Sequence, residues 1–110
     1  FSEGTIIKRT LILLPGRFAI HRLPPSALLP PTVLASSFFS ITRTASELSI
    51  VCPESISIPS SRVSVGWCGW RVAGALDFAL TGILAGLSKT LADAGVSLFA
   101  VSTYDTDYIF

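Results

Sequence analysis

Residues 37–48 read SFFSITRTASEL, and residues 97–108 read SLFAVSTYDTDY. Each stretch begins with apolar residues typical of a strand, passes through a short polar run and reaches an acidic residue. Two strand-like runs joined by a few turn-forming residues are typical of a β-hairpin. We therefore infer an internal repeat in which one hairpin is used twice, at an offset of 60 residues. The aligned pairs are Phe39 with Phe99, Ile41 with Val101, Thr42 with Ser102, Ser46 with Thr106, and Glu47 with Asp107.

The first hairpin follows a predicted strand and a connector that prolines interrupt. Residues 17–23 predict the strand, and the four prolines within residues 24–35 prevent a continuous helix. We expect at most one helical turn in this connector, at Ser26–Leu29. His21 stands in the predicted strand without a nucleophile motif nearby, and we expect it at the surface or at a sheet edge.

The second hairpin follows a predicted strand and a predicted helix. Residues 63–73 indicate a strand that is bent or bulged at Gly66 or Gly69. Residues 81–94 indicate a helix, because apolar residues recur at intervals of three and four, and Gly95 stands where helices commonly stop. The repeated unit, strand–helix–strand–strand, predicts an α+β fold of the ferredoxin-like sandwich type, with helices on one face of the sheet.

The repeat divides the chain into two halves that we expect to pack as one unit. The chain has 110 residues, enough for one domain or for two very small modules. We assign residues 11–52 to the first half, in which the helix is degenerate. Residues 53–62 form a Pro/Ser-rich connector, and residues 63–110 form the second half.

Composition excludes several classes of protein. Half of the residues are hydrophobic and 14% are charged, which excludes intrinsic disorder. A net charge of +1 gives no reason to expect nucleic acid or an anionic membrane as a partner. The apolar stretches 23–42 and 73–88 are broken by prolines or are too short to cross a bilayer. So few charges leave much apolar surface to cover, which favours either a homo-oligomer or the loss of a segment that would otherwise cover that surface.

Residues typical of catalysis and metal binding are sparse. Cys52, Cys68 and the single histidine make no ligand cluster, so we expect no metal and two reduced thiols in a cytoplasmic protein. The sequence holds no nucleophile motif, phosphate-binding loop or dinucleotide fingerprint. We therefore expect a protein that is not an enzyme and has no cofactor.

The segment LTGILAGLSKTLADAGVSLFAVSTYDTDYIF, residues 80–110, resembles ACT domains, the small ligand-binding modules of amino-acid metabolism. It looks most like the branch of small two-module ACT proteins related to the cytosolic arginine sensor of the TOR pathway. LLPGRFAIHRLPP, FFSITRTASELSIVCPE and GWRVAGALDF are similar to earlier blocks of that branch. ACT domains read strand–helix–strand–strand–helix–strand, so the resemblance implies that the second half, residues 63–110, is truncated before its last helix and last strand. We therefore expect part of one sheet face to be bare.

The start of the predicted helix is the first candidate binding place. Free N–H groups and a partial positive charge at a helix start suit a carboxylate, and Gly82 lets a ligand approach the backbone. The resemblance implies that a regulatory amino acid lies at this loop, with Leu80, Thr81 and Gly82 as contacts. The same residues also fit a simple helix cap at Thr81 and close helix packing at Gly82.

The STYDTD motif is the second candidate binding place. The carboxylate of Asp105 or Asp107 is suited to a ligand's ammonium group or cationic side chain. The resemblance implies that Thr103, Tyr104 and Asp107 match ligand-contacting positions, and Ser102 adjoins them. Alternatively, the motif is a plain hairpin turn whose side chains bond to their own backbone, with Tyr104 packed over it.

The matching turn of the first half holds Arg43, Thr44, Ser46 and Glu47. If the two copies are pseudo-symmetric, these residues lie near a second, degenerate pocket. Alternatively, Arg43 and Glu47 form a surface ion pair, which contributes under ~1 kcal/mol.

The sequence thus predicts a non-catalytic regulatory module that binds a small amino acid at an interface between ACT units. The alternative is a structural or protein-interaction module that has the same shape and has lost its ligand. The expected partners are the amino acid and either a second copy or another ACT-containing protein, without nucleic acid or a membrane.

Overall fold

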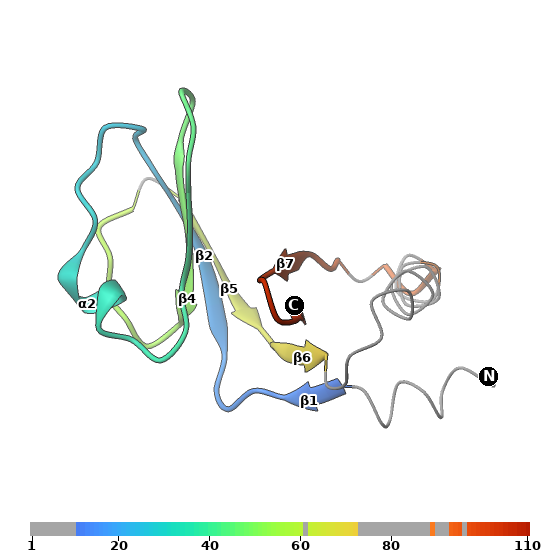
Figure 1. Cartoon of the computed structure of the whole chain (residues 1–110). Helices are drawn as coiled ribbons and strands as arrows, with labels where there is room; N and C mark the ends of the chain where they lie inside the picture. Colours follow the sequence, from blue (N-terminus) through green and yellow to red (C-terminus); the bar gives the residue numbers. More distant parts are fainter. Residues whose placement is uncertain (1–10, 61, 73–88, 90–92, 96) are drawn as a thin grey trace. The chain divides into compact units, whose positions relative to one another are not determined.

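The computed structural model divides the chain into two compact units (Figure 1). Unit 2 is the continuous segment Pro15–Cys68, whereas unit 1 combines Phe1–Leu14 with Gly69–Phe110. The backbone therefore passes between the units twice. The division into halves at residues 53–62 stays a prediction. The structure describes residues 11–60, 62–72, 89, 93–95 and 97–110.

Unit 2 contains a four-stranded antiparallel sheet and one short helix. Its elements are β2 Phe18–Leu23, α2 Pro31–Leu34, β3 Ser40–Arg43, β4 Leu48–Pro53 and β5 Arg62–Trp67. The strand order is β3-β4-β2-β5, so β2 and β4 are the central strands. The predicted first hairpin is confirmed as β3 and β4.

In its described residues, unit 1 contains a second four-stranded antiparallel sheet. Its strands are β1 Leu11–Leu13, β6 Trp70–Val72, β7 Ala100–Ser102 and β8 Asp107–Ile109. The strand order is β1-β6-β8-β7, and the predicted second hairpin is confirmed as β7 and β8. The strand expected over residues 63–73 is divided between the units, with β5 in unit 2 and β6 in unit 1.

The two sheets have the same topology. The order β3-β4-β2-β5 corresponds to β7-β8-β6-β1, and every neighbouring pair is antiparallel in both sheets. This arrangement confirms the α+β ferredoxin-like class. The edge position that β5 takes in unit 2 is taken in unit 1 by β1, from the opposite end of the chain. The sequence patterns did not indicate that pairing.

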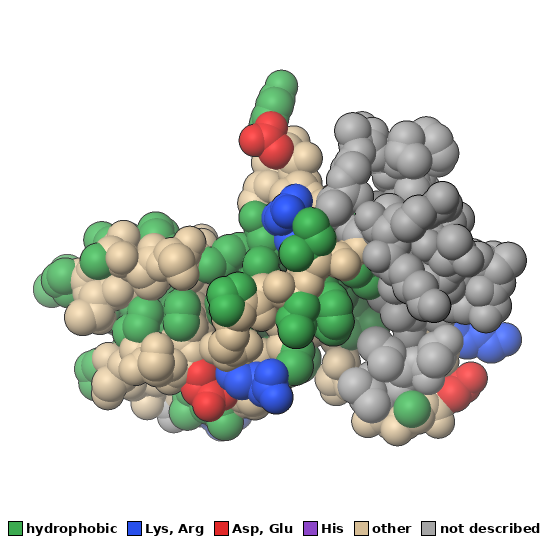
Figure 2. Space-filling model, turned by 90° about the horizontal axis from the view of Figure 1, so that it is seen from below, with side chains coloured by type: hydrophobic (Ala, Val, Ile, Leu, Met, Phe, Trp, Pro, Cys, Tyr) green, Lys and Arg blue, Asp and Glu red, His purple; other side chains and the backbone are tan. Residues whose placement is uncertain are grey.

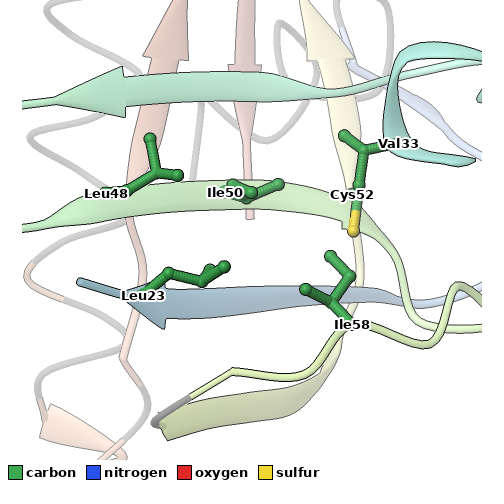
Figure 3. Close-up of a cluster of buried hydrophobic side chains, with 6 residues drawn as sticks. All are labelled: Leu23, Val33, Leu48, Ile50, Cys52 and Ile58. Atoms are coloured by element: carbon green, nitrogen blue, oxygen red, sulfur yellow. The ribbon is translucent and has the colours of Figure 1, made fainter. Parts of the chain in front are cut away.

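A hydrophobic core lies on one face of the unit 2 sheet (Figure 3). Side chains two residues apart on a strand point to the same face, which brings alternate residues of β4 together. Leu23 of β2 lies directly opposite Leu48. Val33 comes from α2 and Ile58 from the segment before β5, so both connectors of the unit contribute to the core. The cluster consists of Leu23, Val33, Leu48, Ile50, Cys52 and Ile58.

The helical turn of the first connector lies at Pro31–Leu34, and the prediction of Ser26–Leu29 was wrong. Pro30 restricts Leu29 to extended conformations, which prevents a helix from running up to it. Pro31, by contrast, has a fixed φ that suits the first position of a helix. The backbone at Ser26 forms only a turn, closed by the N–H of Ala27 donating to the carbonyl of Pro24 at 3.0 Å.

Most of the predicted helix over residues 81–94 lies outside the described residues. Lys89 and Asp93 are helical. Gly95 has a φ of 72°, the left-handed conformation that was predicted for the end of this helix.

Gly66 produces the predicted irregularity in β5. Phe18 is opposite Trp67 and Ile20 is opposite Ser64, so β5 holds one more residue than β2 over this interval. Such an insertion is a β-bulge. Gly66 has a φ of 84°, a conformation that glycine adopts without strain.

Candidate functional site

The STYDTD motif forms the turn that joins β7 to β8. The N–H of Thr103 donates to the carbonyl oxygen of Thr106 at 2.8 Å. The Thr103 hydroxyl donates to the same oxygen at 2.9 Å, and the N–H of Thr106 donates to Oγ1 of Thr103 at 3.2 Å. The Thr103 side chain is therefore a structural part of the turn, as the alternative interpretation of this motif expects.

Two other hydroxyl groups connect the turn to its surroundings. Oγ of Ser102 donates to Oδ1 of Asp107 at 2.5 Å, across the last pair of the β7–β8 ladder. Oγ1 of Thr106 donates to the carbonyl oxygen of Val72 at 2.5 Å, which ties the turn to the end of β6. A hydroxyl has one proton to donate, so the protons of Ser102, Thr103 and Thr106 are all used within the chain.

Asp107 is the carboxylate that this network fixes in place. It is partly exposed, and strand alternation places it on the same face of the sheet as the buried Ile109. An ionised carboxylate has about four acceptor sites, and Ser102 uses one of them. Asp107 thus combines a defined position with remaining capacity to accept hydrogen bonds.

Tyr104 projects away from the turn. Its exposed fraction is 103%, so it does not pack over the turn as one of the two interpretations expected. Asp105, next to it, is also exposed.

The side chains of this strand end therefore present mainly acceptor atoms and negative charge. Such a surface is complementary to an ammonium or guanidinium group, because charge-assisted hydrogen bonds to a carboxylate are the strong ones. Leu80, Thr81 and Gly82 lie outside the described residues, so their proximity to Asp107 stays a prediction.

The turn between β3 and β4 repeats the same geometry. The N–H of Thr44 donates to the carbonyl oxygen of Glu47 at 2.9 Å, and the N–H of Glu47 donates to Oγ1 of Thr44 at 3.2 Å. Thr44 thus plays the part of Thr103, and Glu47 the part of Thr106. Because the same two hydrogen bonds close both turns, the offset between the copies is 59 residues (Thr44 to Thr103).

The predicted alignment of Glu47 with Asp107 is therefore wrong by one residue. The last ladder pair before the first turn is Arg43 opposite Leu48, and its counterpart is Ser102 opposite Asp107. Leu48 is 0% exposed. Nη2 of Arg43 donates to the carbonyl oxygen of Ala27 at 2.6 Å. Where unit 1 has a carboxylate and a hydroxyl, unit 2 has a buried apolar side chain and a guanidinium bound to its own chain.

His21 is buried, and its predicted place at the surface or at a sheet edge was wrong. It is 5% exposed and lies on a central strand between β4 and β5. Its Nδ1 lies 2.7 Å from Oγ of Ser60, and burial lowers the pKa of the imidazole. The alternation that places His21 on the same face as Leu23 was the available signal for its burial.

Both cysteines are free thiols, Cys52 buried and Cys68 partly exposed. Within the part of the chain that the structure describes, no three His, Cys, Asp or Glu residues gather closely enough to hold a metal ion. Over the same residues, no helix has the length and apolar character needed to span a membrane.

These features define a protein of two ferredoxin-like α+β units, one of which presents a fixed carboxylate at a strand end. Residues 63–110 match the model of the ACT domain. Residues 16–61 match a second family model, described as an N-terminal domain. Residues 63–110 therefore belong to the ACT domain family.

Two known proteins are similar to this chain over most of its length. The human protein CASTOR3P is 32% identical over 107 residues, an alignment that covers 82% of this chain, and the chain spans 66% of the length of that relative. The crystal structure of protein Atu0741 from Agrobacterium tumefaciens is similar with a TM-score of 0.77 and 37% identity. This likeness covers 90% of this chain and 74% of that one.

Proposed function

We propose that this chain is a non-catalytic regulatory module that binds a small amino acid at an interface between ACT units. Asp107 binds the positively charged end of the ligand. The N–H groups at the predicted helix start, around Leu80, Thr81 and Gly82, bind its carboxylate. The observation that carries the proposal is the carboxylate of Asp107, held at the strand end by the Ser102 hydroxyl.

The neighbouring residues have separate tasks in this proposal. Ser102 orients the Asp107 carboxylate, and Thr103 keeps the turn closed. Tyr104 is fully exposed, which supports a contact with a ligand or with a second ACT unit rather than with its own hairpin. Membership of the ACT family supports an amino acid as the class of ligand.

Ligand binding acts by changing which packing of the units or partners is favoured. A ligand shifts such an equilibrium only as far as its affinity differs between the two packings. A ligand that contacts two units at once binds more tightly to the packing that completes its site than to the packing that leaves the site incomplete.

A thermal-shift screen with each of the twenty amino acids tests the proposal. A ligand that binds only the folded chain stabilises it by about 2.7 kcal/mol at one hundred times its Kd. We expect one or a few amino acids to raise the Tm at millimolar concentration. Asp107→Asn should abolish the shift, and the control Asp105→Asn should preserve it. The absence of any shift in the wild type would contradict the proposal.

An ACT-shaped structural or protein-interaction module without a ligand is the second candidate. It is favoured by the turn's internal hydrogen bonds, which use the protons of Ser102, Thr103 and Thr106. In that case no amino acid changes the Tm, and Asp107→Asn leaves self-association unchanged. Sedimentation velocity of both proteins, with and without the amino-acid mixture, separates the two candidates.

The proposed partner is a second copy or another ACT-containing protein, in the cytoplasm. Hydrophobic side chains cover much of the described surface drawn in Figure 2, where charged side chains are few. On the edge strand β5, Val63 is 53% exposed and Val65 is 61% exposed. Apolar surface of this kind supports association.

A further inference from the structure

We infer that position 107 is a core position of the repeat, and that the aspartate there lowers the stability of unit 1 while providing its binding group. The statement that Asp107 provides the binding group rests on the proposed function. The statement that position 107 is a core position does not, since it follows from the comparison of the two sheets.

The ladders place Asp107 and Leu48 at the same point of the fold. In unit 2, Leu48 lies opposite Leu23 on the neighbouring central strand. In unit 1, Trp70 is opposite Ile109 and Arg71 is opposite Tyr108, so the next pair along the ladder is Val72 and Asp107. The hydrogen bond from Thr106 to the Val72 carbonyl agrees with this register.

The surroundings of the two positions are alike. Leu48 is fully buried beside Leu23, which is 4% exposed. Asp107 has Ile109 two residues away on its own strand, 4% exposed, and Val72 on the neighbouring strand, 8% exposed. Asp107 therefore lies between the exposed Ser102 on β7 and the buried Val72 on β6, as Leu48 lies between Arg43 and Leu23 in unit 2.

The Asp107 carboxylate is partly exposed, so it loses only part of its hydration beside Val72 and Ile109, and it regains one hydrogen bond from Ser102. A leucine would instead add apolar contact with Val72 and Ile109, as Leu48 does with its neighbours. Asp107→Leu should therefore stabilise the chain and remove its ability to bind a cationic group.

Thermal unfolding of the full 110-residue chain tests the inference, with Asp107→Leu, Asp107→Asn and the turn control Asp105→Leu. We expect Asp107→Leu to raise the Tm by about 4 °C or more. Asp107→Asn, which stays polar, should change the Tm by less than about 2 °C, and Asp105→Leu should not raise it. A Tm of Asp107→Leu at or below that of the wild type overturns the inference, as does failure of that variant to fold. An equal rise in Asp105→Leu also overturns it, because the effect is then one of added apolar surface in general.

The amino-acid response is measured on the same proteins as a separate readout. We expect Asp107→Leu and Asp107→Asn to lose the response that the wild type shows. If the wild type responds to no amino acid, the proposed function fails, yet the Tm values still decide whether position 107 is a core position.

Discussion

Nδ1 of His21 lies 2.7 Å from Oγ of Ser60, and this hydrogen bond joins a central strand of unit 2 to the segment before β5. Oγ of Ser60 donates its proton to the carbonyl oxygen of Ile58 at 3.2 Å, so it accepts from the imidazole. The neutral ring therefore carries its proton on Nδ1. Nε2 is buried without a hydrogen-bond partner among the described residues, and it is the atom that a second proton would reach.

The first prediction concerns stability against pH. Burial lowers the pKa of His21 from its ordinary value of 6.5, and the residues directly opposite it, Ile50 and Val63, offer no compensating charge. The unfolded chain therefore takes up the proton at a higher pH than the folded chain. The contribution of the neutral, buried His21 to the free energy of unfolding is therefore fully present above about pH 6.5, and it is lost as the pH falls below that value.

Urea unfolding between pH 5 and pH 8 measures this loss. His21 is the single histidine of the chain, so His21→Leu should remove the dependence near pH 6. A dependence that persists unchanged in this variant would show that another group is responsible.

The second prediction concerns the bulge of β5. A Cβ added at Gly66 meets nothing within 4 Å, so Gly66→Ala is penalised only by its φ of 84°. We expect a loss of about 1–2 kcal/mol in the free energy of unfolding. Gly66→Asn should cost less, because asparagine tolerates the left-handed region. Equal losses in the two variants would rule out backbone conformation as the cause.

The third prediction concerns the core of unit 2. Leu48→Ala removes a side chain that is 0% exposed, and we expect it to lower the free energy of unfolding by about 2–5 kcal/mol. The matched control is Leu28→Ala, at a side chain that is 90% exposed, which should stay within about 0.5 kcal/mol of the wild type. Chemical denaturation measures both, and a small effect at Leu48 would contradict the assigned core.

The fourth prediction concerns the equivalence of the two turns. Thr44→Val and Thr103→Val each remove a hydroxyl that closes a turn. We expect each to cost about 1 kcal/mol, and Thr44→Ser and Thr103→Ser to cost less because they keep the hydroxyl. A clear loss at only one of the two positions would show that the turns are not equivalent.

Both hairpins were predictable from the sequence because their signals are local. Alternating apolar residues flank a short polar run in each, and the strands form where the pattern places them. The predicted offset of 60 residues was wrong because it pairs Glu47 with Asp107, two acidic residues that do not occupy equivalent positions. The hydrogen bonds of Thr44 and Thr103 fix the true offset, and these bonds are visible only in three dimensions.

The pairing of β1 could not be predicted, because a three-residue apolar run such as Leu11–Leu13 carries no information about its partner. Burial of His21 was missed for a related reason. A histidine in a strand is exposed or buried according to the strands beside it, and the position of β5 beside β2 was not known.

The pairing of β1 with β6 affects the order in which the chain assembles during synthesis. The ribosome releases β1 first, but the partner of β1 emerges only after all of unit 2 has been made. Unit 2 has every one of its strands once Trp67 has left the exit tunnel, whereas the unit 1 sheet must wait for β8. Vectorial synthesis therefore favours early closure of unit 2, while β1 remains an unpaired strand in the nascent chain, the kind of exposed edge that chaperones protect.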